Sequence, residues 1–149
     1  MKKIFCIGLI MFFGTCVLAF SQKTSHKLVG IWQFCNEMKK SDGEKVLAFS
    51  PIWKVLYSDG SFSQFMLMYK DGGCALTHEG TYEVLSDDTY TEFISQHAVD
   101  KDLIGKKTEL TYHFLNEDMV AFTYKLYGRN DEFHELWKRV KLYSPTKSK

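Results

Sequence analysis

Residues 108–125 read TELTYHFLNEDMVAFTYK, a stretch in which polar and apolar side chains alternate on both sides of a turn. A three-residue loop at Asn116-Glu117-Asp118 would make this stretch a β-hairpin with one dry face and one wet face. The dry face gathers Leu110, Tyr112, Phe114, Val120, Phe122 and Tyr124, and the wet face gathers Glu109, Thr111, His113, Ala121, Thr123 and Lys125. This hairpin predicts an antiparallel sheet that covers a core on one side.

Two further hairpins precede this one along the chain. Ser86-Asp87-Asp88 as a three-residue loop places Glu92 among the inward side chains, whereas a two-residue loop would turn Glu92 outward and Phe93 inward. Ser58-Asp59-Gly60-Ser61 predicts a two-residue type I′ turn, because Asp and Gly tolerate its positive φ angles. That turn would place one set of side chains on the inner face: Trp53, Val55, Tyr57, Phe62, Gln64, Met66 and Met68.

The lengths of the connections predict how the strands are arranged. The expected strands are Leu28–Asn36, Trp53–Ser58, Ser61–Lys70, Thr77–Leu85, Thr89–His97, Thr108–Leu115, Met119–Tyr127 and Glu132–Lys141. In an up-and-down meander, alternate connections lie at the same end, so the tight turns gather at one end and the long loops, 37–52 and 98–107, at the other. The sequence therefore predicts an all-β protein, an eight-stranded antiparallel up-and-down barrel with a closed base and an open mouth.

Residues 1–21 are expected to be a secretory signal peptide, and residues 22–149 the barrel domain. Two lysines precede an apolar run over 4–20, and Ala19 and Ser21 supply the small residues before the cut. The alternative is an uncleaved membrane anchor, for which this run is short. The residues before Cys16 make a poor lipoprotein box, so we expect no lipid anchor and a periplasmic or secreted protein.

The mature chain carries nearly balanced charge and two cysteines. Nineteen Lys and Arg face 18 Asp and Glu in the whole chain, so no basic excess attracts nucleic acid. We expect no membrane span in the mature chain. Cys35 and Cys74 are candidates for a disulfide in an oxidising compartment, and two separate thiols are the alternative.

Four residues at the two ends of the domain are expected to close the base. Gly30 and Trp32 lie in the first strand, and Trp137 and Arg139 lie near the end of the last strand. An arginine over an indole ring makes a cation–π contact, and its guanidinium can also donate hydrogen bonds to backbone carbonyls. The sequence thus predicts a plug where the first and last strands meet.

The chain here resembles the lipocalin-like, or calycin, superfamily, whose signature is Gly-x-Trp in the first strand and Arg after the last. More closely, it is similar to an uncharacterised family of small secreted lipocalin-like bacterial proteins. The matching motifs are Leu28-Val29-Gly30-Ile31-Trp32, Asp59-Gly60-Ser61-Phe62, Gly80-Thr81-Tyr82, Tyr90-Thr91-Glu92 and Glu135-Leu136-Trp137-Lys138-Arg139. The resemblance implies a barrel that can hold a ligand, although no helix is expected after the last strand.

The expected function is binding of a small hydrophobic ligand at the mouth, in a small cavity. The predicted lining is Trp53, Tyr57, Met66, Met68, Tyr90, Glu92, Tyr112 and Tyr124. A buried carboxylate needs a partner, so Glu92 and Glu135 are expected either to anchor a ligand or to join Arg139 and tyrosines in a structural network.

The alternative function is a protein-interaction or inhibitor module, with a solid barrel as scaffold for its loops. The five histidines show no metal-ligand spacing, and no nucleophile or phosphate-loop motif is present. We therefore expect no metal, no cofactor and no enzymatic activity.

Overall fold

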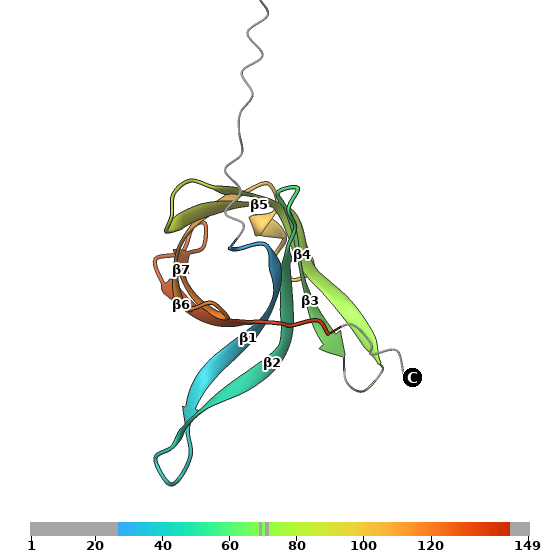
Figure 1. Cartoon of the computed structure of the whole chain (residues 1–149). Helices are drawn as coiled ribbons and strands as arrows, with labels where there is room; N and C mark the ends of the chain where they lie inside the picture. The colour runs from blue at the N-terminus through green and yellow to red at the C-terminus, as the bar shows by residue number, and fades with distance from the viewer. Residues whose placement is uncertain (1–26, 69, 71, 144–149) are drawn as a thin grey trace, which may run out of the picture.

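The computed structural model describes residues 27–68, 70 and 72–143, which form one closed antiparallel barrel (Figure 1). Each strand pairs with the next along the chain and the last pairs with the first, so the predicted up-and-down barrel is confirmed. The elements are β1 (Gly30–Lys39), β2 (Lys45–Leu56), β3 (Ser61–Met68), β4 (Gly73–Val84), β5 (Thr89–His97), the 3₁₀-helix η1 (Lys101–Leu103), β6 (Lys107–Asn116), β7 (Met119–Lys125) and β8 (Glu132–Arg139).

The predicted signal peptide, residues 1–21, lies outside the described residues. Within the part of the chain that the structure describes, no helix is both long and apolar enough to cross a membrane.

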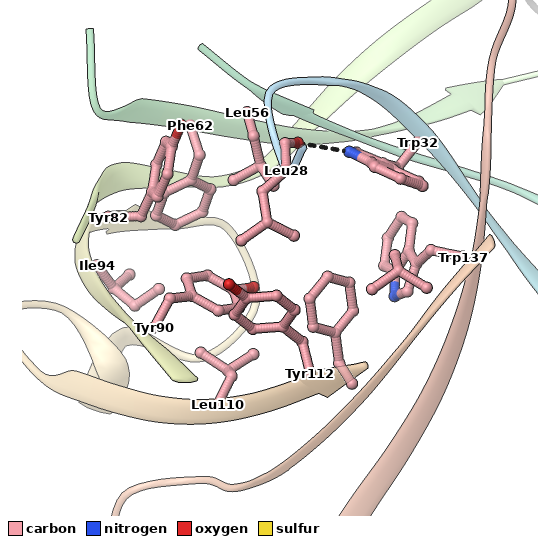
Figure 2. Close-up of a cluster of buried hydrophobic side chains, with 12 residues drawn as sticks. Leu28, Trp32, Leu56, Phe62, Tyr82, Tyr90, Ile94, Leu110, Tyr112 and Trp137 are labelled. Carbon is pink, nitrogen blue, oxygen red and sulfur yellow. Dashed lines mark hydrogen bonds between the residues drawn. The ribbon is translucent and has the colours of Figure 1, made fainter. Parts of the chain in front are cut away.

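An aromatic core fills the closed end of the barrel (Figure 2). Tyr90 is fully buried there, and its ring meets those of Tyr82, Tyr112 and Phe122 edge-on at centroid distances of 6.3, 5.8 and 5.6 Å, the geometry that aromatic quadrupoles favour. The buried cluster consists of Leu28, Trp32, Leu56, Phe62, Tyr82, Tyr90, Ile94, Leu110, Tyr112, Val120, Phe122 and Trp137. These side chains fill the cross-section near the base, and the cavity that Glu92 lines lies nearer the mouth.

Arg139 closes the base as predicted. Trp32 on β1 pairs with Arg139 on β8, and the guanidinium carbon lies 4.1 Å from the centre of the Trp32 rings. The same guanidinium donates hydrogen bonds to the carbonyls of Val29, at 2.9 Å, and of Lys27. The Trp32 indole N–H donates to the Leu28 carbonyl at 2.8 Å (Figure 2). The first residues of the domain are thus fastened to its last strand.

Gly30 is required beside this closure. Its φ angle is +147°, a conformation that side chains rarely adopt, and a Cβ placed on it would lie 2.6 Å from Nη1 of Arg139. Any larger residue at this position would displace the guanidinium from Trp32.

The hairpin between β2 and β3 differs from the prediction. Leu56 pairs with Phe62, and the Tyr57 N–H bonds to the Ser61 carbonyl at 2.9 Å, so the loop holds three residues rather than two. Only Gly60 in this loop has a positive φ, +84°, and Asp59 instead accepts hydrogen bonds from the N–H and hydroxyl of Ser61. The type I′ turn is therefore wrong. The extra loop residue turns Lys54 and Leu56 inward in place of Trp53 and Tyr57.

The predicted long loop 37–52 is also wrong, because most of it is strand. β1 and β2 stay paired from Asn36↔Ala48 to Lys39↔Lys45, beyond the last pairs that either makes with β8 or β3. This two-stranded extension, residues 36–49, projects from the barrel (Figure 1), and we call it the first ribbon. β3 and β4 extend in the same way beyond the barrel wall through Leu67↔Cys74 and Met68↔Gly73.

Cys35 and Cys74 are separate thiols, so the candidate disulfide does not form. Cys35 is buried on β1, between pairing partners on β2 and β8, whereas Cys74 is exposed on the extension of β4. Two intervening strands separate their backbones, and a disulfide needs its two Cα atoms within about 7 Å of each other.

Replacing Arg139 by Ala removes a cation–π contact and three hydrogen bonds at the base, one of them long at 3.4 Å, and we expect the free energy of unfolding to fall by about 2–4 kcal/mol. Urea unfolding followed by tryptophan fluorescence measures this loss. Arg139→Lys keeps the positive charge but lacks the planar guanidinium with its several N–H donors, so it should recover only part of the stability. A fall below about 0.5 kcal/mol in Arg139→Ala would contradict the closure role.

Candidate functional site

A cavity of about 240 Å³ lies inside the barrel, between the aromatic core and the mouth. Ile94 and Leu110 separate it from the core, while Leu103 of η1 and Leu126 reach it from the mouth loops. Its lining is Lys54, Gln64, Thr77, His78, Glu92, Ile94, His97, Leu103, Thr108, Leu110, Tyr124, Leu126 and Glu135. The predicted small cavity toward the mouth is therefore confirmed, and most of its lining residues have polar side chains.

Lys54 and Glu92 form a buried ion pair on the wall of this cavity. The ammonium lies 2.8 Å from Oε1 of Glu92, and each residue is 4% exposed. The Tyr90 hydroxyl donates to the same oxygen at 2.8 Å. The ammonium also lies 5.6 Å from the ring centres of Phe62 and Trp137, so aromatic faces stabilise its charge. Strands β2 and β5 thus carry the two charged residues, and the aromatic core packs against them.

Glu135 on β8 is held by neutral donors. The Tyr124 hydroxyl donates to its Oε1 at 2.7 Å, and the Trp137 indole N–H donates to its Oε2 at 2.9 Å. No ion pair involves this carboxylate among the residues that the structure describes. Burial, followed by the charge of Glu135, raises the pKa of Tyr124, so this phenol stays protonated and keeps donating.

His78 and His97 lie face to face at the mouth side of the cavity. Their rings are stacked with centroids 5.1 Å apart. Nδ1 of His97 accepts hydrogen bonds from the backbone N–H groups of Asp100, at 2.8 Å, and Val99, at 3.3 Å. That nitrogen therefore carries no proton, and the ring orders the start of the 98–106 loop.

Burial lowers the pKa of His78 to about 4, and the positive charge of Lys54 acts in the same direction. The nearby negative charge of Glu92 only partly offsets these two effects. His78 is consequently a neutral imidazole at pH 7, able to donate one hydrogen bond and accept another.

Several polar groups on the cavity wall have no hydrogen-bond partner within residues 27–68, 70 and 72–143. They are the Gln64 amide, the His78 imidazole, the Thr108 hydroxyl and Oε2 of Glu92. Thr108 is only 7% exposed. Among the described residues, Trp53 Nε1 is the one fully buried polar side-chain atom without a partner, so these four groups face the solvent of the cavity, where a polar molecule that enters can bond to them.

The mouth loops are joined above the cavity. Arg129 lies 3.6 Å from a carboxylate oxygen of Asp100, and the Lys106 ammonium lies 4.4 Å from the ring centre of Tyr127. These contacts connect the loop that carries η1 to the loop between β7 and β8. Leu103, on the first of these loops, is buried and lines the cavity.

The structure places two of the eight predicted lining residues, Glu92 and Tyr124, on the cavity wall. Tyr90 and Tyr112 are buried in the core, although Tyr90 reaches the site through its bond to Glu92. The remaining four do not line the cavity: Tyr57 and Met68 are 44% and 40% exposed, Trp53 packs against Phe65, and Met66 pairs with Ile52 and Ala75. The wrong loop length explains the orientation predicted for Trp53 and Tyr57 on β2. Met66 and Met68 lie on β3 beyond an irregularity in its pairing with β4, between Gln64 and Phe65, which the sequence did not indicate.

The predicted partner of the buried carboxylates was also wrong. Arg139 is engaged at the base with Trp32 and backbone carbonyls, and Lys54 is the cation that pairs with Glu92. Sequence reasoning missed Lys54, Thr77, His78 and Thr108, and it placed Gln64 on the inner face without including it in the predicted lining. The signal for Lys54 was available, because Asp-Gly also fits a three-residue loop with Gly in the left-handed position.

No group of three or more His, Cys, Asp or Glu side chains in the described part of the chain is arranged to hold a metal ion. The family model described as a domain of unknown function (DUF4488) matches residues 27–147, a range that includes all eight strands. The chain has no match among curated proteins.

Replacing Lys54 by Met leaves Glu92 buried without its cation, and we expect a loss of about 3–5 kcal/mol in the free energy of unfolding. The double variant Lys54→Met/Glu92→Leu removes both charges and should regain most of that loss. The exposed pair between Lys45 and Glu37, at 3.2 Å, gives a matched control, because Lys45→Met should cost less than about 1 kcal/mol. Additive effects of the two buried substitutions in urea unfolding would contradict the pairing.

His78 should make the protein less stable as the pH falls from 6.5 toward 4. Its pKa is about 4 in the folded protein against 6.5 ordinarily, so in this window the unfolded chain binds a proton that the folded one does not. This difference in proton binding lowers the free energy of unfolding by at most about 3 kcal/mol. Urea unfolding at pH 7 and pH 4.5 should show a smaller difference for His78→Gln than for the wild type. The exposed-site variant His113→Gln should behave as the wild type; equal pH dependence in all three would refute this role.

Proposed function

Because the chain belongs to the DUF4488 family, whose description assigns no activity, we propose a function from the geometry of the barrel: it binds a small amphipathic molecule in the cavity at its mouth. The observation that carries this proposal is a cavity inside the barrel whose wall holds polar groups without protein partners among the described residues. Ligand sites are typically concave and apolar with a few placed polar groups.

The two kinds of wall support a ligand with two unlike ends. Ile94, Leu103, Leu110 and Leu126 supply apolar surface, which suits the hydrophobic ligand expected from the sequence. Gln64, His78, Thr108 and Glu92 supply hydrogen-bonding capacity, which suits a polar head group. At about 240 Å³ the cavity is smaller than most drug-sized sites, so the ligand is a small metabolite.

We also propose a calycin ancestry, a location in the periplasm or beyond, and binding without catalysis. The contact of Trp32 with Arg139 supports kinship with the calycins, and the apolar run over residues 4–20 supports export to the periplasm or beyond. Binding without catalysis is favoured because donors already hold both interior carboxylates, Glu92 and Glu135, in hydrogen bonds.

A protein-interaction module is the second candidate. The observation that favours it is the first ribbon, on which Met38 and Phe49 are more than half exposed although both lie on strands. In that case the barrel is a scaffold and the cavity holds only water. A test for bound ligand therefore separates the two candidates.

Protein purified from its native host should release a small molecule on denaturation, detectable by mass spectrometry. Leu126→Trp places an indole in the mouth of the cavity and should reduce the recovered ligand by about tenfold or more, because an overfilled site excludes its ligand. Leu115→Trp adds the same bulk at an exposed position away from the cavity and should retain the ligand. Repeatedly empty wild-type protein would contradict the proposal and favour the interaction module.

A further inference from the structure

The interior of the cavity carries an excess of negative charge. Lys54 is the one cation on its wall, whereas Glu92 and Glu135 are both carboxylates. His78 is neutral, and His97 keeps Nδ1 unprotonated for two backbone donors. With Lys54 paired to Glu92, the charge of Glu135 has no counter-ion among the described residues.

The negative charge of these carboxylates affects the pKa values of the two tyrosines beside them, Tyr90 and Tyr124. Burial and then the charge of Glu92 raise the pKa of Tyr90, and burial and then the charge of Glu135 raise that of Tyr124. Each carboxylate also acts on the other's tyrosine, so the two charges share one region of low dielectric. There an uncompensated carboxylate is costly, and a cation gains more attraction than it would in water.

Two observations independent of the charge count indicate a ligand at this place. The Glu92 side chain is 5% exposed, lines the cavity, and has an oxygen, Oε2, without a partner among the described residues. The Thr108 hydroxyl lines the same cavity at 7% exposure and likewise has no partner there. Both are acceptors that an N–H group of a ligand would satisfy.

From the cavity and its unbalanced carboxylates we propose that the ligand carries a positively charged amine, which pairs with Glu135 and hydrogen-bonds to Oε2 of Glu92. Its apolar part lies against Ile94, Leu103 and Leu110. This inference rests on the proposed binding function and specifies the chemical class of the ligand. The charges on the mouth loops, such as Asp100 and Arg129, lie in solvent and partly cancel, so the interior decides the preference.

Three probes of the same shape test the inference: phenethylamine, 2-phenylethanol and 3-phenylpropionate, titrated into the protein at pH 7 by calorimetry. We expect the amine to bind at least about tenfold more tightly than the alcohol, and the anion most weakly. Equal affinities, or a preference for the anion, would overturn the amine assignment while leaving small-molecule binding intact. Failure of all three to bind would overturn both the assignment and the proposed function.

Single substitutions then test which carboxylates cause the preference for the amine. Glu135→Gln keeps the size of the side chain and its acceptor oxygen, and should weaken amine binding by about tenfold while changing alcohol binding by less than about twofold. Glu92→Gln makes the same charge change at the second carboxylate and should act in the same direction. Glu109→Gln removes a charge from an exposed position on β6 and should leave both affinities unchanged. Equal loss in Glu109→Gln would show that net charge, not the cavity, attracts the amine and would overturn the assignment.

Discussion

The hydrogen bonds between β8 and β1 are the constraint on which the rest of the molecule depends, because they turn a twisted sheet into a barrel without free edges along its wall. They join segments more than 100 residues apart, and Arg139 reinforces them by binding the Trp32 ring and the carbonyls of Lys27 and Val29. Gly30 has no side chain to obstruct that contact. With one end closed in this way, the cavity inside the barrel lies toward the mouth.

The sealed end determines where a cavity can form. Tyr90 and its aromatic neighbours fill the cross-section near the base, as expected for a barrel of eight strands, whose interior is only just wide enough for side chains. Above them the inward positions change from aromatic to polar, with Lys54, Glu92 and Glu135 at the boundary. Tyr90 and Trp137 belong to the core and also donate to these carboxylates. The core therefore fixes the position of the charged groups that line the cavity.

The sequence was sufficient to predict the barrel, its closure and most of its aromatic core. The hairpin before β7 has the predicted faces, with Tyr124 inward, although Asn116 pairs with Met119 and a bulge after Phe114 replaces the predicted three-residue loop. At 86–88 the sequence left two loop lengths open, and the structure has the three-residue loop, which turns Glu92 inward with Tyr90. Clear alternation on both strands restricted the register only at the first of these hairpins. The first ribbon and the extension of β3 and β4 could not be predicted in the same way. A strand that leaves the barrel is no longer buried on one face, so its sequence lacks the apolar–polar alternation by which a strand is recognised. Residues 46–49 are strand because they pair with β1, not because they cover a core.

The error at residues 57–61 shows how the base of the barrel controls the chemistry of its mouth. Side chains alternate strictly along a strand, so one more residue in a loop exchanges the inward and outward sets of the strand before it. In β2 that exchange replaces Trp53 and Tyr57 with Lys54 and Leu56. Asp59 and Gly60, which set the loop length at the closed end, thereby place the one cation of a cavity that lies nearer the opposite end. One additional residue in the turn therefore decides whether β2 presents apolar or charged side chains to the interior. The preference of this barrel for polar or apolar ligands thus depends on turn geometry as well as on the residues at the site.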